Sequence, residues 1–180
     1  NDAKDMLACL SILGIKMEID EENETITVQG CGGRLPVREA SVNVGSAGTA
    51  ARFLTALLAF SAGVYHLDAS EQMKKRPMKP LLDALIKLGA IISYDEAEGH
   101  FPFTIDSRAV KGGEISLDTG ISSQFLSAVV MTGFLLPDGL KVNIAGGRES
   151  LPYVDMTAKV MESFGMKPDV VCENGVVSYI

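Results

Sequence analysis

The sequence predicts an α/β fold built from repeated units, and three observations support this prediction. A helix-like segment that ends in glycine recurs three times, and its stop glycines Gly14, Gly89 and Gly165 lie 75 and 76 residues apart (89 − 14 and 165 − 89). Strand-like segments follow these helices. Two other segments, 48–58 and 125–136, are apolar almost throughout, as buried helices are. We therefore expect amphipathic outer helices, strands and buried, parallel inner helices arranged around a pseudo-threefold axis.

The period divides the chain into units of about 1–72, 73–149 and an incomplete 150–180, all within a single domain that spans 1–180. The last unit has no inner helix of its own. We expect the missing helix to come from sequence before Asn1 or after Ile180, and the chain to be one domain of a longer protein. Parallel inner helices would gather their N-termini at one end, where the positive ends of the helix dipoles favour anions.

Composition narrows the classes of function. With 180 residues, 47% hydrophobic and 22% charged, the chain suits one globular domain with a substantial core. The net charge of −7 argues against a general nucleic-acid partner, and the apolar runs are too short to span a bilayer. No leader sequence opens the chain, so we expect a cytoplasmic protein. The isolated cysteines and histidines favour reduced thiols and no metal site; they are Cys9, Cys31, Cys172, His66 and His100.

Polar residues gather at the starts of the repeated helices, in stretches 45–52, 71–80, 120–126 and 146–153. Gly48 would let backbone N–H groups approach an anion closely, and Arg76 could clamp a carboxylate or phosphate. Ser122 is a suitable N-cap for the second inner helix. Taken singly, each stretch also fits a plain cap, a tight turn or a solvated basic loop. Their occurrence at corresponding helix ends favours one shared anion site.

These four stretches resemble the signature segments of the 5-enolpyruvylshikimate-3-phosphate synthase family, also called 3-phosphoshikimate 1-carboxyvinyltransferases. The matching segments read Gly-Ser-Ala-Gly-Thr-Ala-Ala-Arg, Met-Lys-Lys-Arg-Pro, Ser-Ser-Gln-Phe-Leu and Ser-Leu-Pro-Tyr, in that order along the chain. The resemblance implies an inside-out α/β barrel of two domains, each with three βαβαββ units. This chain would be one enolpyruvyl transferase-like domain.

The resemblance also implies the reaction: transfer of the carboxyvinyl group of phosphoenolpyruvate to the 5-hydroxyl of shikimate 3-phosphate, with release of phosphate and without metal or organic cofactor. This step belongs to the shikimate pathway, which supplies chorismate and the aromatic amino acids. By the same resemblance, shikimate 3-phosphate would be held by Ser122, Ser123, Gln124 and Ser150, with Tyr153 beside it. Phosphoenolpyruvate would be held by Gly48, Arg76 and Gln124, with Thr49 and Arg52 lining the same loop.

No catalytic residue is assigned within this chain. The family's Lys-Ser and Arg of an N-terminal segment, and the Asp, Glu, Lys and Arg groups of its other domain, have no counterparts here. We therefore expect the second domain of the same enzyme as a partner, and negligible turnover by the chain alone. Ser46 stands where the family often has Asn, and Gln72 where Arg is common, so the fine geometry of substrate binding stays open.

Two alternatives remain open from the sequence. A UDP-N-acetylglucosamine enolpyruvyl transferase shares the architecture, but it typically carries a reactive Cys in the loop that corresponds to 70–77, where this chain has none. A non-catalytic anion-binding or assembly module built on the same repeat is the second alternative. Binding of shikimate 3-phosphate would separate these possibilities.

Overall fold

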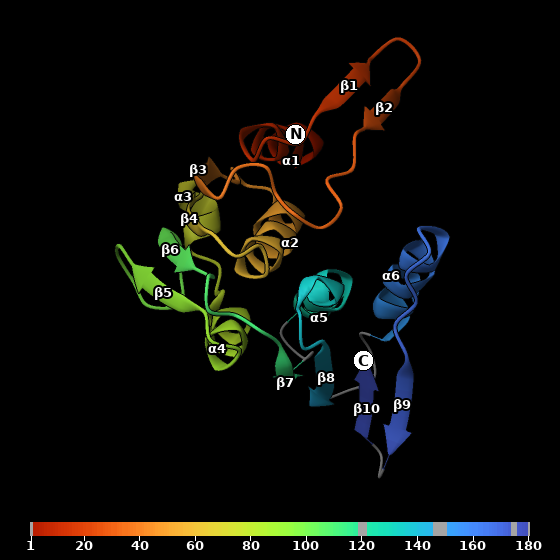
Figure 1. The fold of residues 1–180 in the computed structure, drawn as a ribbon. Helices are drawn as coiled ribbons and strands as arrows, with labels where there is room; N and C mark the ends of the chain where they lie inside the picture. The colour runs from red at the N-terminus through yellow and green to blue at the C-terminus, as the bar shows by residue number, and fades with distance from the viewer. Residues whose placement is uncertain (1, 119–121, 146–150, 174–175, 180) are drawn as a thin grey trace.

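This computed structural model has two four-stranded sheets with the same connectivity, around which the helices are arranged (Figure 1). The structure describes residues 2–118, 122–145, 151–173 and 176–179. The first sheet has the order β3-β4-β6-β5 and the second β7-β8-β10-β9. In each, the first two strands are parallel and the last two form an antiparallel hairpin. The parallel pair requires a crossover, which an inner helix supplies.

The elements before and within the first sheet are α1 (Asp2–Ile12), β1 (Met17–Asp20), β2 (Thr25–Val28), β3 (Glu39–Asn43), α2 (Gly48–Ala59), β4 (Val64–Asp68), α3 (Glu71–Lys74), α4 (Lys79–Lys87), β5 (Ile91–Tyr94) and β6 (Phe103–Asp106). Those of the second are β7 (Gly113–Asp118), α5 (Ser123–Thr132), the 3₁₀ turn η1 (Gly133–Leu135), β8 (Leu140–Ala145), α6 (Leu151–Ser163), β9 (Val170–Glu173) and β10 (Val176–Tyr179). Among the described strands the sheets are open, and none closes into a barrel.

The repeat is a βαβαββ unit, but its phase differs from the one expected from the helix spacing. The strands that bond into one sheet come from 39–106 and from 113–179, so each sheet crosses a boundary expected near 72 or 149. A sequence period fixes the length of a unit but not the point at which it starts. Strand pairing decides that point, because β4 bonds to β6 and β8 to β10.

The inner helices α2 and α5 pack side by side at the centre, as expected from their apolar sequences (Figure 1). Small residues such as Ala50 and Ala51, both buried, let α2 approach its neighbours closely. Phe125 and Val129 are buried on α5. The outer helices cover the strands: α1 contacts β3, and α4 contacts β7. The expectation that 125–136 has no exposed face was wrong at its end, because Phe134 in η1 is 52% exposed.

Helix starts set the geometry of the site. Ser122 caps α5, and its Oγ accepts a hydrogen bond from the Gln124 N–H at 3.2 Å. The second outer helix does not begin at Pro77. Instead, α4 begins at Lys79 with Pro80 in its first turn, and the short helix α3 occupies part of the basic segment. Within the described part of the chain, every helix is too short or too polar to cross a membrane.

Candidate functional site

The first turn of α2 is the point on which the candidate site converges. A Cβ atom added to Gly48 would lie 3.0 Å from Nη1 of Arg76, 3.2 Å from Nη1 of Arg52 and 3.9 Å from Oε1 of Gln124. These groups come from α2, from the α3–α4 connection and from α5. Glycine at position 48 therefore keeps open a space that two guanidinium groups and an amide border.

The first turn of α5 reaches this space beside the first turn of α2. The side-chain amide of Gln124 donates from Nε2 to Oγ1 of Thr49 at 3.3 Å, across 75 positions of sequence. This bond joins the starts of the two inner helices, as the pseudo-threefold arrangement predicted. The first turns of two helices therefore lie near each other, and the positive ends of their dipoles favour a negatively charged ligand.

Arg76 is held at this point by the short helix α3. Ser70 caps α3 by accepting from the Met73 N–H at 3.3 Å, and its hydroxyl shares a 2.7 Å hydrogen bond with Ser46. The Ser70 N–H also donates to the Gly45 carbonyl at 2.9 Å. Met73 is fully buried, and the Arg76 N–H donates to its carbonyl at 2.9 Å. The exposed Arg76 side chain thus starts from a backbone fixed against the 45–48 loop.

Arg52 is the unusual member of the cluster, because it is a cation with only 6% of its surface exposed. Its Nη1 donates to the Gly48 carbonyl at 3.1 Å and to the Met73 sulfur at 3.4 Å. Its Cζ lies 5.8 Å from the centre of the Phe125 ring, a cation–π contact with α5. Its Nε has no hydrogen-bond partner among the described residues. Burial lowers the pKa of the Arg52 guanidinium, and repulsion from the Arg76 charge lowers it further.

The cluster is positive in a protein whose net charge is −7. Among the described residues, no carboxylate forms an ion pair with Arg52 or Arg76. By contrast, Lys74, close in sequence, contacts three carboxylates, those of Asp68, Glu71 and Glu96. The positive charge over Gly48 is therefore left without a counter-ion from the described residues, as a site that receives an anion requires.

The structure brings part of the predicted set together and leaves part outside it. The residues that meet at the starts of α2 and α5 are Gly48, Thr49, Arg52, Arg76 and Gln124. Ser122 and Ser123 stand at the same helix start, half-buried. Tyr153 on α6 is 58% exposed, and no hydrogen bond joins its side chain to the described part of the cluster. Ser150 lies outside the described residues.

Two supporting residues had no separate role in the sequence reasoning. Met73 and Phe125 contact the Arg52 guanidinium from two sides, one from α3 and one from α5. Both lie inside the matched segments, Met-Lys-Lys-Arg-Pro and Ser-Ser-Gln-Phe-Leu. Their membership of these segments was the signal that could have pointed to them.

The solved structures to which this chain is similar define its fold. Two structures described as EPSP synthase from Acinetobacter baumannii match 99% of the chain with a TM-score of 0.77 and 22% identity, over 38% and 39% of their own length. The α/β fold is therefore the one seen in those proteins.

The family of the chain follows from its sequence similarity to known proteins. The family model described as EPSP synthase (3-phosphoshikimate 1-carboxyvinyltransferase) matches residues 1–175, and the chain belongs to this family. Curated relatives named 3-phosphoshikimate 1-carboxyvinyltransferase are 40% identical in Pseudoalteromonas translucida and 41% in Laribacter hongkongensis, each over 167 residues. The matches cover 93% and 92% of this chain and 39% of each relative's length.

Proposed function

We propose that the chain is a substrate-binding domain of a transferase that moves the carboxyvinyl group of phosphoenolpyruvate to the 5-hydroxyl of shikimate 3-phosphate and releases phosphate. The observation that carries this proposal is the convergence of Gly48, Arg76 and Gln124 on one open point. Both substrates are phosphorylated acids, and helix starts with guanidinium groups suit such ligands. Membership of the family supports this reaction over the UDP-N-acetylglucosamine alternative.

Within this proposal the two substrates use neighbouring parts of the site. Phosphoenolpyruvate lies over Gly48, with Arg76 and Gln124 as its ligands and Thr49 and Arg52 lining the loop. Shikimate 3-phosphate lies along the start of α5, held by Ser122, Ser123 and Gln124, and by Ser150 and Tyr153 from the next segment. The order of these segments along the chain is that of the family's motifs.

A second domain of the same enzyme completes the site in this proposal. The chain spans 39% of the length of its relatives from Pseudoalteromonas and Laribacter, so most of their length has no counterpart here. The proposal expects that missing part to bring the catalytic acid and base, and the reaction to take place in the cytoplasm. A transferase assay of the chain alone should then show negligible turnover, and turnover at the rate of a full-length relative would contradict this expectation.

Calorimetric titration tests the binding part of the proposal. The chain should bind shikimate 3-phosphate, and in its presence phosphoenolpyruvate. Arg76→Ala should weaken phosphoenolpyruvate binding by about one to two decades, because a charge-assisted hydrogen bond contributes about 1.5–3 kcal/mol.

The control for this titration is Arg108→Ala, since Arg108 is an exposed arginine whose side chain pairs with Asp106 instead of the cluster. Its affinities should equal those of the parent chain. Absence of any binding of shikimate 3-phosphate would favour the non-catalytic module.

A further inference from the structure

Arg52 is buried under conditions that destabilise a cation. It is 6% exposed, and the described residues offer its Nε no hydrogen-bond partner and its charge no carboxylate. Removing a charge from water destabilises the fold unless an opposite charge or a full set of hydrogen bonds compensates. Among the described residues, the charge that acts on Arg52 is that of another cation, Arg76, and both guanidinium groups border the space over Gly48.

The contacts of Arg52 hold its guanidinium against neighbouring groups of the protein. Nη1 already donates to the Gly48 carbonyl and the Met73 sulfur, and the plane lies near the Phe125 ring. The side chain therefore bridges the first turn of α2, helix α3 and the first turn of α5. These three segments also carry the polar groups of the candidate site, so Arg52 sets their spacing.

An apolar side chain of the same length would fill this position at lower cost. Met73 and Phe125 supply an apolar surrounding that suits a methionine well. Positions at which a protein departs from the most stable choice concentrate at functional sites. The charge at position 52 is then explained if a ligand supplies the missing negative charge.

We propose that Arg52 is a positioning residue and a buried counter-charge for a phosphate-bearing anion held over Gly48 by Arg76, and that it is retained at the expense of the stability of the empty fold. This inference rests on the proposed function in that both use the same space. It differs in assigning the role of Arg52 to its charge and to the spacing of three segments, and not to a direct bond with the substrate.

Thermal unfolding of the chain with inorganic phosphate as the probe tests this inference. Without phosphate, Arg52→Met should raise Tm by about 2–4 °C, because an uncompensated buried charge is removed. Titration should show that the same variant binds phosphate about tenfold more weakly, because one unit of positive charge close to the anion is lost. Opposite changes in Tm and affinity are the signature that a purely structural role would not produce.

Two variants keep the test decisive. Arg52→Lys keeps the charge and should retain phosphate affinity within about threefold, because the attraction between the counter-charge and the anion depends on the charge and its distance. Arg76→Ala should lose affinity with little change in Tm, because that side chain is exposed. Each titration is repeated with chloride at equal ionic strength, which separates phosphate binding from general screening.

The outcomes are distinct. A lower Tm with unchanged phosphate affinity in Arg52→Met would overturn the inference and leave Arg52 as a structural residue, while the proposed function would stand if Arg76→Ala still lost affinity. Equal binding of phosphate by the parent chain, Arg52→Met and Arg76→Ala would overturn both. Lost affinity together with a raised Tm in Arg52→Met, recovered by Arg52→Lys, supports the inference.

Discussion

The outer helices α4 and α6 hold the same place in the two repeats and have opposite surroundings. Leu88 and Phe164 each stand one residue before a stop glycine, yet Leu88 is 6% exposed and Phe164 is 83% exposed. Ala84 and Val160, each five residues before that glycine, are 3% and 53% exposed. Equivalent residues in a repeat therefore need not have equivalent environments.

The difference follows from what lies beside each helix. Helix α4 packs against β7, the first strand of the next unit, and the Leu88 side chain comes within 3.6 Å of the Cβ position of Gly113. Helix α1 packs in the same way against β3, and Leu13, one residue before its stop glycine, is fully buried. Among the described residues, no later unit supplies such a strand to α6.

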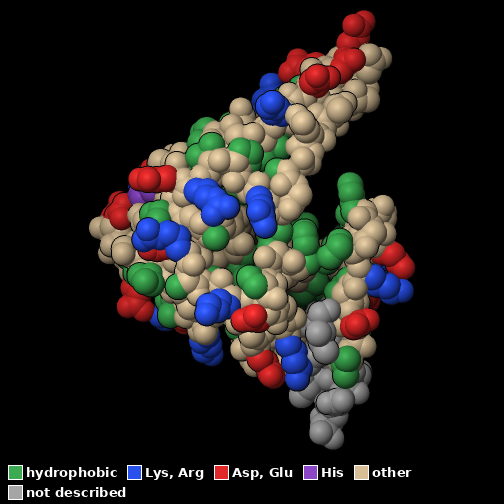
Figure 2. All heavy atoms as spheres, viewed as in Figure 1, with side chains coloured by type: hydrophobic (Ala, Val, Ile, Leu, Met, Phe, Trp, Pro, Cys, Tyr) green, Lys and Arg blue, Asp and Glu red, His purple; other side chains and the backbone are tan. Residues whose placement is uncertain are grey.

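A second surface that the described residues leave uncovered lies between α1 and α5. A hollow of about 360 Å³ there is lined mostly by apolar side chains, including Phe53, Leu57, Met131 and Phe134. The strands β1 and β2 pair as an antiparallel hairpin, and Figure 2 shows apolar side chains facing the gap between this hairpin and α6. A third inner helix packed against α2 and α5 would have its place on this side. That this helix comes from elsewhere in a longer chain stays a prediction.

The largest expected difference between α4 and α6 is in the effect of truncating side chains at equivalent positions. Leu88→Ala should lower the free energy of unfolding by about 2–5 kcal/mol, because it empties a buried site. Phe164→Ala should change it by less than about 0.5 kcal/mol, because that ring is mostly in water. Urea unfolding of the two variants measures both values. Similar losses at the two positions would show that α6 is covered in solution as α4 is.

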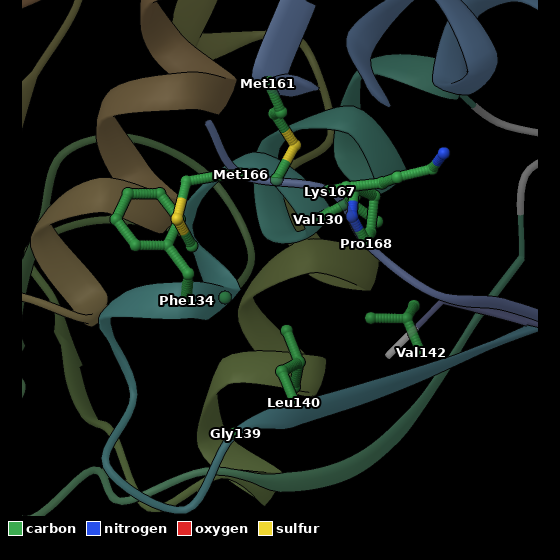
Figure 3. Close-up of a pocket in the computed structure, with 10 residues that line it drawn as sticks. Val130, Phe134, Gly139, Leu140, Val142, Met161, Met166, Lys167 and Pro168 are labelled. Carbon is green, nitrogen blue, oxygen red and sulfur yellow. The ribbon is translucent and has the colours of Figure 1, made fainter. Parts of the chain in front are cut away.

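A smaller effect concerns packing inside the second repeat. Figure 3 shows a cavity among η1, β8 and the segment after α6, with Val142 and Met166 among its labelled residues. Its volume is about 150 Å³. Val142→Ile should fill part of it and raise the free energy of unfolding by about 0.5–1 kcal/mol, since one buried methylene contributes about 0.8 kcal/mol.

The matched control for the cavity is Val42→Ile on β3 of the first repeat. Val42 is 2% exposed and does not line this cavity, so an added methylene should crowd its neighbours and cost about 1–3 kcal/mol. Urea unfolding again gives the values. Loss of stability in both variants would mean that the second repeat is packed as tightly as the first.

The smallest expected effect concerns the carboxyl group of Asp106 at the end of β6. Asp106 ends β6 opposite Val64, whereas Tyr179 stands opposite Val142 in the second sheet. Hydrogen bonds from the Arg108 guanidinium and N–H lower the pKa of the Asp106 carboxyl to about 2. Arg108→Ala should return this pKa toward the ordinary 3.8, which an NMR titration of the carboxyl carbon measures.

The sign of the pH dependence follows from the lowered pKa. A carboxyl whose pKa is lower in the folded state contributes stability above its unfolded pKa of 3.8, and this contribution is lost as the pH falls from about 4 to about 2. The group is exposed, so the effect on unfolding should be small. An Asp106 pKa that stays near 2 in Arg108→Ala would remove the Arg108 side chain as its main cause.

Local patterns in the sequence were enough to predict most elements of the fold. The stop glycines, the Ser122 cap and the two apolar helices each depend on residues within one or two turns of one another, so they can be read without the neighbours. That the starts of α2 and α5 meet, with Gly48 and Gln124, also follows from the sequence, because helices of equal phase in a repeat start at the same end. Arg76 lies in the connection between α3 and α4, and the tertiary structure brings it to this point.

Tertiary structure alone decided the phase of the repeat, the burial of Arg52 and the exposure of Phe164. Each depends on which distant segments meet: β4 with β6, Arg52 with Met73 and Phe125, and α6 with the strand that the described residues do not supply. A hydrophobic pattern records which side chains can be buried, whereas the packing partner determines which of them are. For this reason the side chains at equivalent positions of the helix are buried in one repeat and exposed in the other.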